Sequence, residues 1–383
     1  MRDSPRATIK SVRRETRRAW QRLTAHGLRL AALAVLLLSA LPASAQEPQY
    51  FQEPDHKPLF SWRWDFLARY DRVDHWPYYE PMDRGRFELR PEIDADPLPN
   101  LRLGVRAVFD YGTEDHEDPF YDNFINRGAN LDRLYFVWRP GEFTIRGGKF
   151  GMPLMATEMM WDRDLQTPGG AVSWTPMSVA GGALTFAGAF FYGPQHFGDT
   201  SRIGVGQIAG HFAFEGGLEL EGSASYWGYQ MRDIDVAYFR QNTLSLEPGA
   251  PRYASDFHVA DLLVRLRFPL GSVPVAVSLD GVRNFAAAEG RRNAFDGSVT
   301  AGALGTPGQF RASYGYQYIQ RDAMVGAYNS DDWWYHTWYE GHRVAVAWTF
   351  LPNVYLQGAF TIQRRLDTTY WVHRYLVDLV KMF

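Results

Sequence analysis

The stretch that decides the fold is NVYLQGAFTIQRR, residues 353–365, in which apolar and polar side chains alternate. One side carries Val354, Leu356, Gly358, Phe360 and Ile362, and the other carries Tyr355, Gln357, Thr361, Gln363 and Arg365. The final run repeats the pattern, with Tyr375, Val377, Leu379 and Phe383 on its apolar side. A period of two is that of a β-strand with one apolar and one polar face. Such strands occur in soluble β-sandwiches and in membrane barrels, so features elsewhere in the chain are needed to distinguish the two folds.

The N-terminal residues predict export. Residues 1–26 hold eight of the nine Lys and Arg residues before position 46, an apolar run follows from Leu28 to Leu41, and Ala43-Ser44-Ala45 resembles a cleavage site. We interpret residues 1–45 as a signal peptide, since the apolar run is short for a bilayer span. An N-terminal membrane anchor is the alternative. Residues 46–59 contain three prolines and predict an irregular periplasmic leader, and residues 60–383 are expected to form the main domain.

Charge and composition narrow the class of protein. The chain has 40 basic and 43 acidic residues, and removal of residues 1–45 leaves 31 against 41, a formal net charge of −10. This balance argues against nucleic-acid binding, whose electrostatic footprint is a basic patch. The absence of cysteine excludes a disulfide framework. No apolar run after the signal peptide approaches the ~20 residues of a transmembrane helix. An exported all-β protein, soluble or inserted in the outer membrane, remains.

Strand spacing favours a barrel. Short junctions rich in Pro, Gly and Asn alternate with the long junctions 113–128, 151–167, 230–255 and 322–341. Bacterial barrels have this alternation of periplasmic turns and outer loops, and an even number of strands. The predicted fold is therefore all-β, an up-and-down antiparallel transmembrane β-barrel of about 16 strands. The predicted strands are 60–70, 83–95, 100–112, 129–140, 142–150, 168–176, 181–192, 203–214, 216–229, 256–268, 272–285, 294–304, 308–321, 342–351, 353–365 and 371–383.

Charged side chains gather on one face of several predicted strands. In 83–95, six alternate positions are charged, whereas Phe87, Leu89 and Ile93 lie on the other face. Such charges would be costly in a dry core, but they are tolerated in a water-filled lumen or on the outside of a sandwich. The signs are mixed, which predicts a polar interior with a transverse field. The predicted pore-lining residues are Arg86, Glu88, Arg90, Arg102, Arg106, Arg146, Arg265, Arg267, Arg311 and Arg321.

Two parts of the chain resemble a family of Gram-negative outer-membrane porins. The first comprises Leu131–Tyr135, Gly147–Pro153 and Met160–Leu165, and it is similar to the family's strand pair, turn and W-D-x-D-L loop. The second comprises Tyr314–Tyr318, Asp322–Ala327, Gly341–Arg343, Asn353 and Tyr375–Phe383, and it is similar to the family's C-terminal strands. The resemblance covers roughly residues 83–175 and 308–383. The segment Gly148–Pro153 also resembles the phosphate-selective porin family, which is the second choice.

The resemblance implies a channel in the outer membrane that lets small hydrophilic solutes and ions diffuse through passively. A phosphate- or anion-selective porin, a structural or adhesive barrel, and a lipolytic barrel are the alternatives. We expect no enzyme activity, no cofactor and no metal site. Asp162 and Asp164 are candidates for a constriction loop that folds into the barrel. The aromatic run Trp333–Tyr339 is interpreted first as an interfacial belt and second as a solute-binding loop.

The C-terminal strand carries the predicted assembly signal. The resemblance implies that the barrel-insertion machinery recognises Tyr375, Val377, Leu379 and Phe383. The same strand should pair with residues 60–70 to close the barrel. Expected partners are outer-membrane lipid, the insertion machinery, small hydrophilic solutes and a second and third copy of the chain in a homotrimer, but no nucleic acid.

Overall fold

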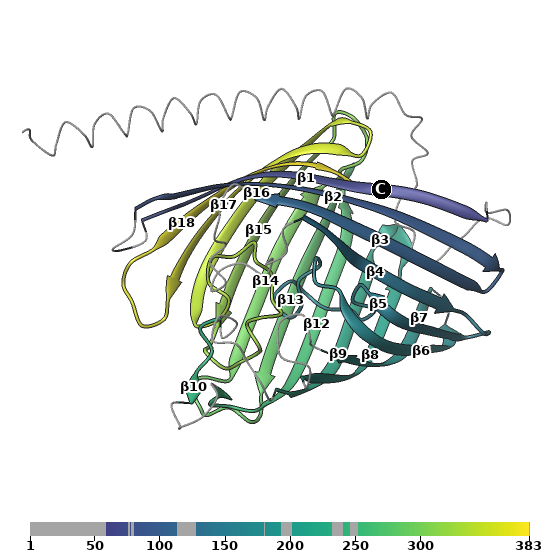
Figure 1. The fold of residues 1–383 in the computed structure, drawn as a ribbon, viewed down its shortest axis with the longest axis horizontal. Helices are drawn as coiled ribbons and strands as arrows, with labels where there is room; N and C mark the ends of the chain where they lie inside the picture. Colours follow the sequence, from purple (N-terminus) through teal and green to yellow (C-terminus); the bar gives the residue numbers. More distant parts are fainter. Residues whose placement is uncertain are drawn as a thin grey trace, which may run out of the picture. The chain divides into compact units, whose positions relative to one another are not determined.

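A computed structural model describes residues 59–75, 77, 80–112, 128–179, 181–192, 201–231, 240–245 and 252–382. Within them, 16 antiparallel strands form a closed barrel in which sequence neighbours are hydrogen-bonded side by side (Figure 1). The predicted up-and-down barrel is confirmed. Its strands are β1 (Phe60–Asp74), β2 (Met82–Leu98), β3 (Leu101–Gly112), β4 (Gly128–Trp138), β5 (Phe143–Phe150), β6 (Thr167–Val179), β7 (Gly182–Tyr192), β8 (Arg202–Ala213), β9 (Glu219–Gln230), β12 (Phe257–Leu270), β13 (Val273–Asn284), β14 (Asn293–Gly302), β15 (Phe310–Ile319), β16 (Tyr339–Leu351), β17 (Val354–Arg365) and β18 (Val372–Lys381).

Two small elements accompany the barrel. A two-stranded sheet of β10 (Leu244–Ser245) and β11 (Arg252–Tyr253) lies in the connection between β9 and β12. One 3₁₀ turn, η1 (Glu215–Gly217), joins β8 to β9. No helix in the described ranges is both long and apolar enough to cross a bilayer. The proposed signal peptide, most of the leader and Phe383 lie outside the described residues.

The barrel closes where β1 pairs with β18, as predicted, but further along β1 than expected. Pairs run from Phe66 opposite Lys381 to Asp74 opposite His373, so residues 60–65 pair only with β2. The first strand continues past residue 70, its predicted end, because Asp71 is held inside the barrel. Its carboxylate accepts hydrogen bonds from Arg374 of β18 at 3.0 and 2.9 Å. The seam is therefore a hydrogen-bonded ladder reinforced by a buried ion pair.

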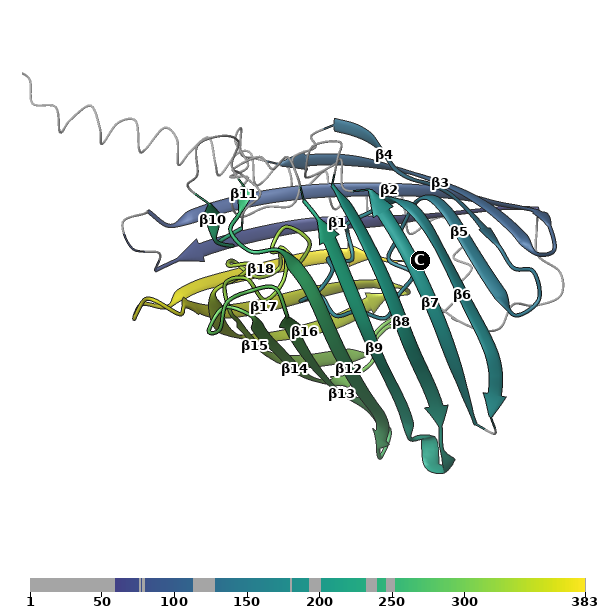
Figure 2. The same cartoon turned by 90° about the horizontal axis from the view of Figure 1, so that it is seen from below.

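The two faces of the wall differ as the alternation predicts. In β2, Glu88, Glu92 and Asp94 are buried on the inner side, whereas Leu89 and Ile93 are exposed on the outer side. Figure 2 shows neighbouring strands of the wall side by side. The same alternation occurs on other strands, whose outer faces carry exposed apolar side chains. Examples are Leu103, Val105, Phe109, Leu262, Val264, Val344, Val346, Trp348, Tyr375 and Val377. An apolar outer surface of this kind suits a hydrocarbon environment.

Part of the interior is apolar, which the sequence analysis did not predict. The inward side chains Phe191, Trp227 and Phe257 are almost completely buried, and two long connections pack onto them. Four residues of the aromatic run belong to this cluster, namely Trp333, Trp334, Tyr335 and Tyr339, and Trp334 and Tyr335 are almost inaccessible to solvent. The interpretation of this run as an exposed interfacial belt is therefore wrong. Stacking on the barrel's inner aromatics removes more apolar surface from water than a position at the rim would.

Candidate functional site

The connection between β5 and β6, residues 151–166, folds into the barrel instead of extending outward. Several inner-wall side chains hold it. The Gln207 amide of β8 donates to the Met155 carbonyl at 2.7 Å and accepts from the Met155 N–H at 2.9 Å. Thr157 donates to the Asp280 carboxylate of β13 at 2.5 Å. Bonds to two strands of the wall thus fix residues 151–166, called the inner loop below, inside the barrel.

The connection between β15 and β16, residues 320–338, forms a second layer against the inner loop. The Asp162 N–H donates to the Tyr328 carbonyl at 2.7 Å, and the Ser330 N–H donates to the Glu158 carbonyl at 2.9 Å. The Trp334 N–H donates to the Gln363 side chain of β17 at 2.6 Å. Backbone groups of both loops are thus paired inside the barrel, where unsatisfied amides would be costly.

An aromatic stack joins the two loops to the wall. The Trp161 ring lies 5.0 Å from that of Tyr328, nearly parallel to it, and 6.1 Å from that of Trp227 on β9. The Trp161 indole N–H donates to the Leu165 carbonyl at 3.2 Å. The indole is therefore buried and fully hydrogen-bonded, as a core tryptophan has to be. It acts as the apolar anchor of the inner loop.

Charged groups surround the tip of the inner loop. Arg90 of β2 contacts both Asp164 and Glu88 at 2.5 Å, and Asp332 lies 2.8 Å from Arg69 and 2.6 Å from Arg343. Each arginine thus bridges a loop to the wall. Ion pairs that are partly shielded from water are stronger than exposed ones, because the effective dielectric constant is lower.

The loop carboxyls differ in their acidity because they differ in their neighbours. Burial, together with the charges of Asp331 and Asp164, raises the pKa of Asp162 well above its usual range. Burial acts on Asp164 in the same direction, but Arg90, Arg86 and Arg69 outweigh it and lower the pKa of Asp164. Likewise, Arg69 and Arg343 lower the pKa of Asp332 despite its burial. At neutral pH, Asp164 and Asp332 are therefore fully ionised.

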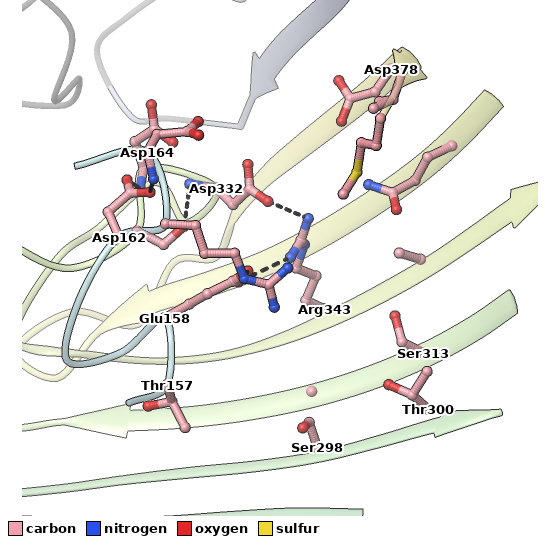
Figure 3. A pocket seen from close by; sticks show the side chains of 18 of the residues that line it. Thr157, Glu158, Asp162, Asp164, Ser298, Thr300, Ser313, Asp332, Arg343 and Asp378 are labelled. Carbon is pink, nitrogen blue, oxygen red and sulfur yellow. Dashed lines mark hydrogen bonds and ion pairs between the residues drawn. The ribbon is translucent and has the colours of Figure 1, made fainter. Parts of the chain in front are cut away.

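A cavity of about 790 Å³ lies between these loops and the wall formed by β12–β18 and β1–β4. Figure 3 shows Glu158, Asp332 and Arg343 on one side of it and Ser298, Thr300 and Ser313 on the other. The latter side, called the small-residue wall, has short side chains in register on neighbouring strands, which leaves the lumen open. It consists of Ala276, Ser278, Ser298, Thr300, Ser313, Gly315 and Ala345.

The predicted pore-lining residues divide into two groups. Glu88, Arg90, Arg106, Arg265, Arg267 and Arg311 line the cavity, together with the loop residues Asp162 and Asp164. The others are not part of the lining. Arg86 pairs with two lining residues, Glu88 and Asp331, the latter at 3.5 Å. Arg102 pairs with Asp96 at 2.9 Å, Arg146 lies opposite Val137, and the Arg321 guanidinium covers the Trp338 ring at 3.2 Å.

Arg163, which was not among the predicted site residues, also lines the cavity, and its side chain is 81% exposed. It contacts Glu158 of the same loop at 3.1 Å. The two carboxylates of W-D-R-D-L indicated a constriction, yet Arg163 between them is more exposed than either Asp162 or Asp164. The described part of the chain contains no group of three or more His, Asp or Glu side chains arranged to hold a metal ion.

Comparisons with known proteins bear on the fold. No family model matches the chain, and no curated protein matches it. Among solved structures, it is similar to OprB of Pseudomonas putida, with a TM-score of 0.62 and 10% identity over 85% of this chain and 94% of that one. It is also similar to a loop-deletion mutant of OmpT, an outer membrane protein of Vibrio cholerae, with a TM-score of 0.50 and 9% identity over 84% and 100% of the two chains. At identities this low, the structural similarity shows a shared barrel fold alone.

Proposed function

We propose that the chain is an outer-membrane porin, through which small hydrophilic solutes and ions diffuse passively. The observation that carries this proposal is the combination of an apolar outer surface with a charged cavity of about 790 Å³ inside a closed barrel. The similarity of the fold to outer-membrane proteins supports the same location. An adhesive or purely structural barrel would not need a lumen lined with short polar side chains.

The inner loop gives the proposed channel its constriction. It crosses the lumen and leaves the passage beside the small-residue wall, where Ser298 and Ser313 keep the space open. Solutes would pass between Glu158 or Arg163 on the loop and this wall. Transfer through such a passage needs hydration by polar groups and no covalent chemistry, so we propose a channel and not an enzyme.

Single-channel recording in a planar bilayer tests the proposal. The purified protein should give stepwise, ohmic conductance. Ser298→Trp should reduce the size of each step, because an indole would fill the passage. Val299→Trp on the same strand is the matched control, since Val299 faces outward and is 43% exposed; it should leave the step size unchanged.

Other outcomes would select other functions. A well-folded barrel without any conductance steps would contradict the porin and favour a structural or adhesive role. Release of fatty acid from phospholipid vesicles by the purified protein would favour a lipolytic barrel. Equal loss of conductance in Ser298→Trp and Val299→Trp would show that the passage does not run beside the small-residue wall.

Assembly partners belong to the same proposal. The insertion machinery would recognise the C-terminal strand, in which Tyr375 and Val377 face outward and Leu379 is half-buried. A homotrimer in the membrane would migrate on a native gel at about three times the size of a monomer. Crosslinking before solubilisation would detect it directly.

A further inference from the structure

The passage beside the inner loop is flanked by more exposed positive than negative charge. Arg163 of the inner loop and Arg311 of β15 both lie within electrostatic reach of Tyr355 on β17 and of Glu158. All four residues line the cavity. This set contains two guanidinium groups and one carboxylate, and Asp164 and Asp332 also act electrostatically on Arg163. We call the set of four residues the eyelet.

Exposure decides which of these charges a solute would meet. The Arg163 side chain is 81% exposed, whereas that of its partner Glu158 is 28% exposed. Glu158 is also shared, since Arg343 lies 3.8 Å from its other oxygen. No carboxylate in the described part of the chain lies within ion-pair distance of Arg311. Within the eyelet, positive charge is therefore more exposed than negative charge, although the chain as a whole is acidic.

The wall that leads to the eyelet has the same polarity. On β12, Arg265 and Arg267 line the cavity and contact Glu221 at 3.0 and 2.6 Å. Arg267 also lies 3.6 Å from Glu219, so the two arginines pair with two carboxylates. The arginines line the cavity and neither carboxylate does, so the positive ends of these pairs face the lumen. The short hydroxyl side chains Ser278, Ser298 and Thr300 lie between this pair and the eyelet and can hydrate an ion.

Exposed acidic groups occur on another side of the inner loop. Asp164 is 35% exposed, but Arg90 of β2 binds it at 2.5 Å, away from β15 and β17. Asp332 is bound by both Arg69 and Arg343. Both carboxylates act electrostatically on Arg163, but each also pairs with an arginine of the wall, which reduces its effect on the eyelet.

We propose that the eyelet makes the passage selective for small anions, such as chloride and short carboxylates. This inference rests on the proposed function, because it concerns which solutes use the same passage. Cations are repelled by Arg163 and Arg311, whereas anions exchange part of their hydration for guanidinium and hydroxyl groups. The overall charge of −10 after removal of the signal peptide does not decide selectivity, since screening confines each charge to about 10 Å at 0.1 M salt.

The reversal potential across a KCl gradient tests the proposal. The wild-type channel should pass chloride more readily than potassium. Arg163→Gln and Arg311→Gln should each lower the chloride-to-potassium permeability ratio at low salt. A unit charge about 4 Å from an ion in water changes its population up to about fivefold, and this factor applies once to the lost attraction of chloride and once to the lost repulsion of potassium. Glu158→Gln should raise the ratio. The double variant of both arginines should favour potassium, since Glu158 then dominates the eyelet.

Arg364→Gln is the matched control. Arg364 belongs to β17, pairs with Glu340 and does not line the cavity, so the same charge is removed outside the passage. The permeability ratio should not change. Conductance steps with a preference for potassium in the wild-type protein would overturn the proposal, and so would an equal shift in Arg364→Gln. A complete lack of conductance steps would instead refute the channel itself, which keeps the two failures distinct. Potassium acetate in place of KCl should reproduce the anion preference if short carboxylates also pass.

Discussion

Replacing Trp161 by alanine should release the inner loop from the barrel wall. Trp161 is 3% exposed and lies between Tyr328 and Trp227. Removal of a buried tryptophan side chain costs about 3–5 kcal/mol. At about 1.4 kcal/mol per factor of ten, the docked state of the loop would lose roughly two to three and a half orders of magnitude in population relative to undocked states.

The remaining contacts set how far the loop responds. The hydrogen bonds of Met155 to Gln207 and of Asp162 to Tyr328 contribute about 0.5–1.5 kcal/mol each. The sum of these contributions is similar to the free energy lost on removal of the Trp161 side chain, so the loop should alternate between docked and undocked positions. The barrel itself should persist, because its strands are held by the closed hydrogen-bond ladder and not by Trp161.

Single-channel recording and limited proteolysis measure the effect. Trp161→Ala should give a larger mean conductance with frequent current fluctuations, and it should expose the inner loop to protease. Trp161→Phe should have a smaller effect, because a phenyl ring can still stack on Tyr328. Trp348→Ala is the control, since Trp348 is 43% exposed on the outer face and should change neither property. A steady, wild-type conductance in Trp161→Ala would refute the anchoring role.

Three further predictions concern the seam, acidity and assembly. Asp71→Asn leaves the buried Arg374 without its carboxylate, which should lower the unfolding free energy by about 3–5 kcal/mol; urea unfolding in detergent measures this, and an unchanged midpoint would contradict a stabilising pair. The pKa of Asp162 is higher with the loop docked than with it undocked, so protonation of Asp162 stabilises the docked loop at low pH. This stabilisation is lost as the pH rises from about 4, the ordinary pKa of an aspartate, through the raised pKa of the docked state. Current noise should therefore increase with pH in the wild-type channel and be flat in Asp162→Asn; the opposite slope would refute the assignment. Phe383→Asp should reduce the yield of barrel in the membrane without altering the conductance of the channels that form, whereas a normal yield would argue against a C-terminal assembly signal.

Much of the barrel could be predicted from alternation alone. A strand such as β17 has to place Leu356 and Gln357 on opposite faces, so the choice of face follows once one side meets hydrocarbon. Loop lengths then fixed the up-and-down order. The number of strands was predictable from the loop lengths, although β1 and β2 extend beyond their predicted ends. In the extension of β1, an ion pair between Asp71 and Arg84 reinforces the ladder.

The site was predictable only in part. Alternation indicated that Arg265, Arg267 and Arg311 face the lumen, but it could not separate them from Arg102, which lies at another height of the same interior. One available signal was overlooked. Alternation breaks down at Phe190-Phe191 and Tyr226-Trp227, where one ring of each pair is exposed outside and the other is buried inside. Two apolar neighbours at a strand end indicate that something apolar covers the inner face.

By itself, the sequence determined the period of each strand, the polarity of the two faces and the positions of the turns, because these depend on residues within a few positions of one another. Only the tertiary structure decided that residues 151–166 and 320–338 fold inward and stack through Trp161 on Tyr328. It likewise decided that Arg163 and Arg311, which are far apart in the sequence, face one passage. Such contacts arise from the closure of the barrel around its own loops, and no local pattern of residues specifies which distant side chains then meet.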